Sequence, residues 1–134
     1  MKPLLRTERL IIRPLRASDY EAWRSAYLDR PKPKNEWERP LKPASEYTRA
    51  KFRKLVRRLD QLIADDLFYD LMIFRKSDGK ILGGVAIMDV RRGLTMGAYL
   101  GYSLFSTYWG QGYAKEAIRA AFVLGFKKLK LHRI

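Results

Sequence analysis

The stretch that decides the fold is YSLFSTYWGQGYAKE, residues 102–116. An apolar and aromatic run leads into a short turn that contains Gly110 and Gly112, and a helical pattern begins directly after it. Such a turn presents unpaired backbone N–H groups at the positive end of a helix, which suits a phosphate or pyrophosphate. Glycine lets the backbone approach such a ligand because it has no side chain. We therefore expect a strand, an anion-binding turn and a helix in succession.

Two other glycine-rich patterns do not fit this spacing. A Rossmann fingerprint needs a third glycine at position 115, which is Lys115 here. A P-loop ends in Gly-Lys-Ser/Thr, whereas Gly112 is followed by Tyr113. A turn with two glycines is also compatible with a plain strand-to-helix connection that binds nothing.

The residues before this stretch have the pattern of strands. Residues 68–75 and 81–90 are rich in aromatic and branched side chains and flank an Asp-Gly turn signal, and residues 96–105 form a third run. The pair Gly83-Gly84 indicates a bulge or a close approach of two backbones. We expect these three strands to form an antiparallel meander.

The N-terminal segment predicts one strand, one helix and a loop. Residues 8–14 form a short apolar run that a proline closes. The pair Ser18 and Glu21 has capping-box spacing and predicts a helix over residues 19–28. Residues 29–44 contain four prolines and are expected to form a long surface loop.

Two amphipathic patterns complete the chain. Residues 45–64 repeat apolar side chains at helical spacing after Ser45, a good N-cap residue, and residues 112–129 predict the last helix. The element order is then β-α-α-β-β-β-α. The fold class is α+β, or mixed α/β if a further strand that begins at residues 132–134 pairs in parallel.

Length and composition limit the possible classes of protein. The 134 residues predict a single domain, residues 1–134, and 47% hydrophobic residues are typical of a globular core. The absence of cysteine and a single histidine, His132, exclude disulfide frameworks, thiolate nucleophiles and standard zinc sites, so no metal is expected. Without a membrane-spanning run or a signal-peptide pattern, we expect a cytoplasmic protein with no membrane partner.

The charge of the chain is strongly positive and unevenly distributed. There are 28 Lys and Arg against 14 Asp and Glu, a net charge of +14. Residues 30–58 contribute +8 and residues 115–134 contribute +5. A solvated helix face accounts for the first patch most simply, and docking of an acidic protein or a ribosomal surface is a second interpretation. The alternative function is a nucleic-acid- or ribosome-binding module that uses the helix over 45–64 without catalysis.

Three motifs in the right order resemble the GCN5-related N-acetyltransferases, most closely the branch of the ribosomal-protein-alanine N-acetyltransferases. They are WGQGYAKEA (109–117), LRTERLIIRPLRASD (5–19) and GYSL (101–104). The family pattern Gln/Arg-x-x-Gly-x-Gly/Ala falls on Trp109-x-x-Gly112-x-Ala114, so Trp109 departs from it. The resemblance implies the acyl-CoA N-acyltransferase fold and transfer of acetyl from acetyl-CoA to a primary amine, either a protein N-terminus or a small amine.

The resemblance also implies which residues hold the co-substrate. The strand whose backbone pairs with the pantetheine arm corresponds to Tyr102, Ser103 and Leu104. The loop whose N–H groups hold the pyrophosphate corresponds to Gly110, Gln111, Gly112, Tyr113, Ala114 and Lys115. No catalytic base can be named from the sequence. Tyr99, Tyr102 and Asp89 are nearby candidates, and His132 is the single histidine.

Family members normally continue past the end of this sequence, which holds only residues 132–134 of the fifth strand of the family. We therefore expect a C-terminally incomplete domain, truncated at that strand, with weak or no activity of its own. An open sheet edge at residues 102–104 also predicts association of two copies of the chain.

Overall fold

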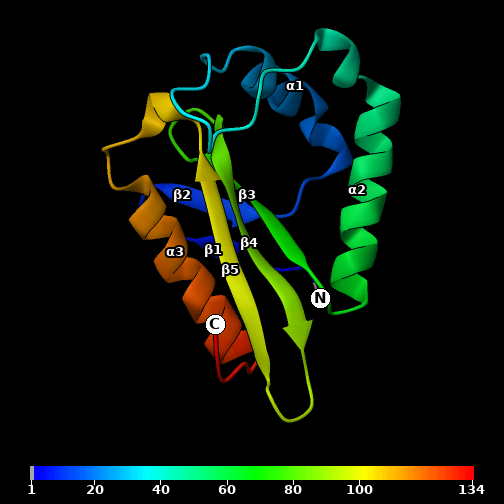
Figure 1. Ribbon diagram of the computed structural model, residues 1–134, viewed down its shortest axis with the longest axis vertical. Helices are drawn as coiled ribbons and strands as arrows, with labels where there is room; N and C mark the ends of the chain where they lie inside the picture. The colour runs from blue at the N-terminus through cyan, green and yellow to red at the C-terminus, as the bar shows by residue number, and fades with distance from the viewer. Residues whose placement is uncertain (1) are drawn as a thin grey trace.

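Five antiparallel strands, in their order along the chain, form one sheet in the computed structural model, which describes residues 2–134. One face of the sheet is covered by α3 and the other by α1 and α2 (Figure 1). The strands are β1 (Leu5–Arg6), β2 (Leu10–Arg13), β3 (Tyr69–Arg75), β4 (Ile81–Arg91) and β5 (Gly97–Leu104). The helices are α1 (Tyr20–Leu28), α2 (Arg49–Ala64) and α3 (Tyr113–Val123). This arrangement confirms the expected α+β class.

Both faces of the sheet are buried, because alternate residues of a strand point to opposite sides. On β3, Leu71 and Ile73 belong to the core cluster that includes Ala117 of α3. Met72, between them, belongs to the cluster that includes Trp23 of α1. This two-sided burial explains why residues 68–75 are apolar almost throughout.

The N-terminal strand differs from the prediction because a short additional strand precedes it. The expected single strand over 8–14 is β2, and β1 lies antiparallel beside it. The connection is closed by two contacts: the Thr7 N–H donates to the Leu10 carbonyl at 3.0 Å, and the Leu10 N–H donates to Thr7 Oγ1 at 3.0 Å. These contacts turn the chain back within three residues.

Both predicted N-caps are wrong, because neighbouring residues take those positions. The N-cap of α1 is Asp19 rather than Ser18; its carboxylate makes no capping bond to α1 and instead accepts the backbone N–H of Arg16 at 2.7 Å across the preceding 3₁₀ turn. At α2 the N-cap is Thr48, whose hydroxyl accepts the Lys51 N–H at 3.2 Å, while Ser45 lies in a preceding 3₁₀ turn. Both serines had the right chemistry, but the backbone becomes helical a few residues later than the pattern predicts.

The segment between α1 and α2 is irregular over residues 29–43, which we call the proline loop. This confirms the loop that the four prolines predict. At the other end of the chain, the last helix is regular only to Val123 and continues as a wider π-type turn over Leu124–Lys128. The expected helix over 112–129 is therefore divided into two parts.

The glycine pair on β4 marks a close approach of two strands, as the sequence predicts. A Cβ atom on Gly83 would lie 2.0 Å from the Ser103 carbonyl oxygen, and φ at Gly83 is +153°. The register between β3 and β4 also shifts next to Ile73. Gly83 therefore lets β4 and β5 approach where a side chain would separate them.

Within residues 2–134, β5 is the last strand of the sheet. At its start, Gly97 forms a single parallel bridge with Arg133, whose carbonyl accepts the Ala98 N–H at 3.1 Å. This bridge runs in the direction expected for a parallel strand that begins at residues 132–134. The helices in this part of the chain are all too short or too polar to cross a membrane.

Candidate functional site

A cavity of about 1040 Å³ lies between the end of β5, the first turn of α3 and the proline loop. Eight of the nine residues that the resemblance assigned to the co-substrate line it. They are Tyr102, Ser103, Leu104, Gly110, Gly112, Tyr113, Ala114 and Lys115. The ninth, Gln111, is not part of the lining. The structure thus brings together the strand and the turn that the sequence singled out.

The turn over residues 109–112, which we call the glycine turn, exposes a row of free donors. Gly110 and Gly112 have φ angles of +75° and +82°, and Gly112 is the N-cap of α3. No side chain caps this helix end. Among residues 2–134 no acceptor is bonded to the backbone N–H groups of residues 110–115. These donors and the helix dipole favour an anion at this place, and Lys115 adds a positive charge.

The indole of Trp109 fixes the glycine turn to the edge strand. Its Nε1–H donates to the Leu104 carbonyl at 2.9 Å. Trp109 is the position that departs from the family pattern, and here it ties the turn to the end of β5. Since the Leu104 carbonyl is already bonded and the Ser103 carbonyl points toward Gly83 of β4, the free edge at this end of β5 is reduced to the backbone of Tyr102 and the N–H of Leu104.

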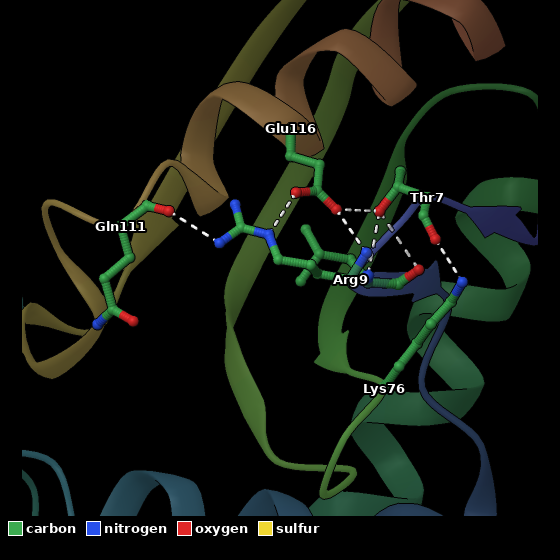
Figure 2. Close-up of polar contacts among 6 residues, drawn as sticks. Thr7, Arg9, Lys76, Gln111 and Glu116 are labelled. Atoms are coloured by element: carbon green, nitrogen blue, oxygen red, sulfur yellow. Dashed lines mark hydrogen bonds and ion pairs between the residues drawn. The ribbon is translucent and has the colours of Figure 1, made fainter.

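An ion pair holds the other side of the glycine turn (Figure 2). The Glu116 carboxylate on α3 accepts the Nε–H of Arg9 at 2.8 Å, the Arg9 backbone N–H at 2.9 Å and the Thr7 hydroxyl. The same guanidinium donates to the Gln111 carbonyl at 2.9 Å and lies 4.3 Å from the centroid of the Tyr113 ring. Figure 2 shows Arg9 reaching from the β1–β2 connection to Glu116 and Gln111. The Gln111 carbonyl is thereby bonded to Arg9, on the side of the turn away from the β5 edge.

The charge of Glu116 would oppose an anion at the helix N-terminus unless it were neutralised. Burial acts against the charged form, but the hydrogen bonds from Thr7 and Arg9 outweigh it and lower the pKa of Glu116. The carboxylate is therefore ionised at neutral pH and is neutralised by the guanidinium. An anion at the glycine turn meets a paired carboxylate instead of a free one.

The proline loop forms the opposite wall of the cavity. Arg30, Trp37 and Arg39 belong to its lining. The Arg30 guanidinium donates to the Arg39 carbonyl, which ties the two ends of the loop together. The Lys34 ammonium lies 5.6 Å from the centroid of the Trp109 ring. The loop therefore reaches across the mouth of the cavity to the glycine turn.

Two titratable groups in the lining have shifted pKa values. Burial raises the pKa of Asp70 on β3, and the guanidinium groups of Arg39 and Arg58 offset this only in part. Burial and the charge of Asp70 raise the pKa of the Tyr27 phenol. Shifted groups in a cavity are typical of functional sites. Neither residue lies in a motif that could have been recognised from the sequence.

The structure separates the candidate bases that the sequence suggested. Only Tyr102 lines the cavity. Asp89 pairs with Arg91 at 3.0 Å, and Tyr99 and His132 are exposed outside the cavity. In residues 2–134 there is also no cluster of three potential ligands that could hold a metal ion.

Arg9 and Thr7 were not identified from the sequence as part of the site. They lie more than 100 positions from Glu116, and an ion pair over that separation cannot be read from local spacing. The sequence held only a weak sign of this pair: Arg9 lies in TERL and Glu116 in AKEA, and both segments belong to motifs that carried the resemblance.

Comparison with known proteins adds an independent observation. A family model described as the acetyltransferase (GNAT) domain matches residues 9–134. YjcK of Bacillus subtilis (strain 168), a probable N-acetyltransferase, is 34% identical over 88 residues, which are 66% of this chain and 49% of that protein. The chain thus spans about half the length of this curated relative.

Solved structures share the fold at low sequence identity. RimJ of Mycobacterium smegmatis, in complex with CoA-disulfide, has a TM-score of 0.74 at 21% identity, covering 98% of this chain and 64% of that one. A ribosomal-protein-S5-alanine acetyltransferase from Vibrio fischeri has a TM-score of 0.75 at 20% identity, covering 97% and 70%. At this identity the likeness establishes the fold alone.

Proposed function

The chain is a member of the acetyltransferase (GNAT) family, and from this premise we propose that its cavity binds acetyl-CoA and that the acetyl group passes to a primary amine. The observation that carries the proposal is that two sets of unpaired backbone groups face the same cavity. The free N–H groups of residues 110–115 and the unpaired edge of β5 line the same cavity. The CoA-disulfide in the RimJ structure supports the choice of ligand.

In the proposed complex the pyrophosphate lies at the glycine turn. The N–H groups of Gly110, Gly112 and the first turn of α3 donate to its oxygens, and Lys115 neutralises part of its charge. The pantetheine arm pairs with β5 as a further strand would, through the backbone of Tyr102 and the N–H of Leu104. Arg9 and Glu116 hold the turn in the required conformation.

The proposed reaction is a direct transfer. The amine nitrogen forms a bond to the thioester carbonyl carbon, the C–S bond breaks, and the sulfur leaves with the electron pair and takes up a proton. The ammonium must lose one proton before attack and the nitrogen a second one afterwards. Backbone N–H groups on β5 are suited to stabilise the developing oxyanion.

The acceptor class is part of the proposal. Some of the similar solved structures are named as acetyltransferases of ribosomal proteins, for example RimL, a ribosomal L7/L12 alpha-N-protein acetyltransferase. Another similar structure is a chimera of a spermidine N-acetyltransferase. A protein N-terminus and a small amine are therefore the two acceptors to test.

Calorimetric titration with CoA tests the binding step. Changing Gly112→Trp forces a side chain into a position with φ of +82° that lies 3.3 Å from Arg9 Nη2, and we expect affinity for CoA to fall at least 100-fold. The matched control is Gly93→Trp, in the β4–β5 turn, where φ is +73° and nothing lies within 4 Å. Equal affinity in both variants, or no binding by the unaltered chain, would reject the proposal.

A further inference from the structure

The proline-loop side of the cavity carries charges of both signs, with Glu38 and Asp70 beside its arginines. Arg30 and Arg39 belong to its lining, and the charges of both Arg39 and Arg58 act on the Asp70 carboxyl. Arg39 lies on the proline loop and Arg58 on α2, so two separate elements bring guanidinium groups to one side of the cavity. In Figure 1 the proline loop runs between α1 and the start of α2, above the sheet.

Part of this positive charge has no counterpart within the protein. On α2, Arg49 pairs with Glu21 at 2.9 Å and Lys51 with Glu46 at 3.3 Å. The remaining cations of the helix are exposed, and no carboxylate of residues 2–134 forms an ion pair with them. They are Arg53, Lys54, Arg57 and Arg58. Arg39 is also without an ion pair among these residues.

The fold does not need these cations. The buried residues of α2 are Phe52, Leu59 and Ile63, which attach the helix to the protein by its apolar side. Neighbouring like charges at helical spacing destabilise a helix by a few tenths of a kcal/mol per pair. Unpaired cations that cost stability and adjoin a binding cavity are suited to a ligand of opposite charge.

We propose that the acceptor is an acidic polypeptide, whose carboxylates bind Arg39, Arg58 and the adjoining cations of α2 while its amine enters the cavity. This inference rests on the proposed function and adds the substrate class. We call the two arginines that are tied to the cavity, Arg39 and Arg58, the acceptor rim.

The geometry favours an acidic peptide over the other two candidate ligands. A polyamine carries several positive charges and is repelled by the acceptor rim. A nucleic acid matches the charge but has no alkylamine to place beside β5. A peptide with acidic side chains supplies an amine for the cavity and carboxylates that match the guanidinium fork.

The test compares two hexapeptides that differ only in charge, Ala-Glu-Asp-Glu-Gly-Tyr and Ala-Gln-Asn-Gln-Gly-Tyr, by calorimetry at low and high salt. We expect the CoA-loaded chain to bind the acidic peptide about tenfold more tightly at low salt, and the preference to shrink at 0.5 M salt. The double variant Arg39→Glu/Arg58→Glu should lose the preference, and its affinity for CoA is measured first so that each peptide titration uses the CoA-loaded chain. The control Lys127→Glu/Lys130→Glu makes the same change in charge beyond the far end of α3 and should keep the preference.

Each outcome decides between alternatives. Equal binding of the two peptides, or a preference that survives in the Arg39/Arg58 variant, overturns the acidic acceptor. Binding of a 20-residue oligouridylate that depends on Arg39 and Arg58, without binding of the acidic peptide, identifies a nucleic-acid surface and also overturns it. Failure of the unaltered chain to bind CoA rejects the proposed function itself. Because CoA and peptide are titrated separately, the two failures are distinguishable.

Discussion

The two walls of the cavity are built in different ways. At the glycine turn, side-chain contacts hold the backbone in place and leave its N–H groups free: Arg9 alone contacts Glu116, Gln111 and Tyr113. At the proline loop the backbone is irregular, and Arg39 is exposed with no ion pair among residues 2–134. The glycine turn is therefore held in place without a ligand, whereas Arg39 on the proline loop is free to bind one.

This difference corresponds to two kinds of ligand. A pyrophosphate has the same shape in every molecule of CoA, so a turn that is held in one conformation binds it with little loss of entropy. Acceptors differ in sequence, and exposed long side chains can adapt to them. The contrast can be tested by changing one residue at a time in each wall and in the strand pair between them.

The largest effect is expected at the strand pair that both walls share. Gly83→Ala places a methyl group 2.0 Å from the Ser103 carbonyl oxygen, so β4 and β5 must separate. We expect the free energy of unfolding in urea to fall by about 4 kcal/mol. Gly93→Ala, which also has a left-handed φ but no close neighbour, should cost only about 1 kcal/mol. Equal costs would show that the close approach of the strands is not limiting.

An intermediate effect is expected at the fixed wall. Glu116→Gln leaves the Arg9 guanidinium without its counterion, and we expect a loss of about 2 kcal/mol in unfolding free energy at pH 7, together with weaker CoA binding. The exposed pair of Glu46 and Lys51 is the control, where Glu46→Gln should change the unfolding free energy by less than about 0.5 kcal/mol.

The same variant gives a pH dependence of known sign. The pKa of Glu116 in the folded protein lies below its ordinary 4.5, so its stabilisation is complete above that value. It is lost as the pH falls through the folded pKa. The difference in unfolding free energy between the unaltered chain and Glu116→Gln should therefore be constant from pH 7 to about pH 5 and decrease below it. A difference that grows on acidification would contradict the ion pair.

The smallest effect is expected at the adaptable wall. Trp37 is 86% exposed, so Trp37→Ala should change the unfolding free energy by less than about 0.5 kcal/mol. Trp23, which is buried in the core beside Phe52, should by contrast cost about 4 kcal/mol on replacement by alanine. A large loss at Trp37 would mean that the proline loop is packed as firmly as the glycine turn.

Local pattern was enough to predict most of the fold. Helical spacing identified α1, α2 and α3, and the glycine pair predicted the close approach on β4, because each of these features depends on neighbouring residues. The N-caps were missed, since Ser45 and Thr48 have the same chemistry and only the folded backbone selects between them. The pairing of Arg9 with Glu116 was missed because it depends on where β1 and β2 lie relative to α3.

The candidate site shows the same limit. The glycine turn and the end of β5 are adjacent in sequence, so a motif could indicate them together. The opposite wall is assembled from α1, the proline loop and β3, and no local pattern connects Tyr27, Arg39 and Asp70. The total charge predicted a partner, but only the structure places part of that charge beside the cavity.

The three tryptophans give the protein its own optical reporters. Trp23 is 6% exposed in the core, Trp109 is 42% exposed and hydrogen-bonded at the glycine turn, and Trp37 is 86% exposed on the proline loop. Their emission should therefore span the range from an apolar to an aqueous environment. With single-tryptophan variants, CoA would be read at Trp109 and an acceptor at Trp37, while Trp23 reports whether the core is intact. The two walls of the cavity can thus be followed by fluorescence in separate variants, without any added label.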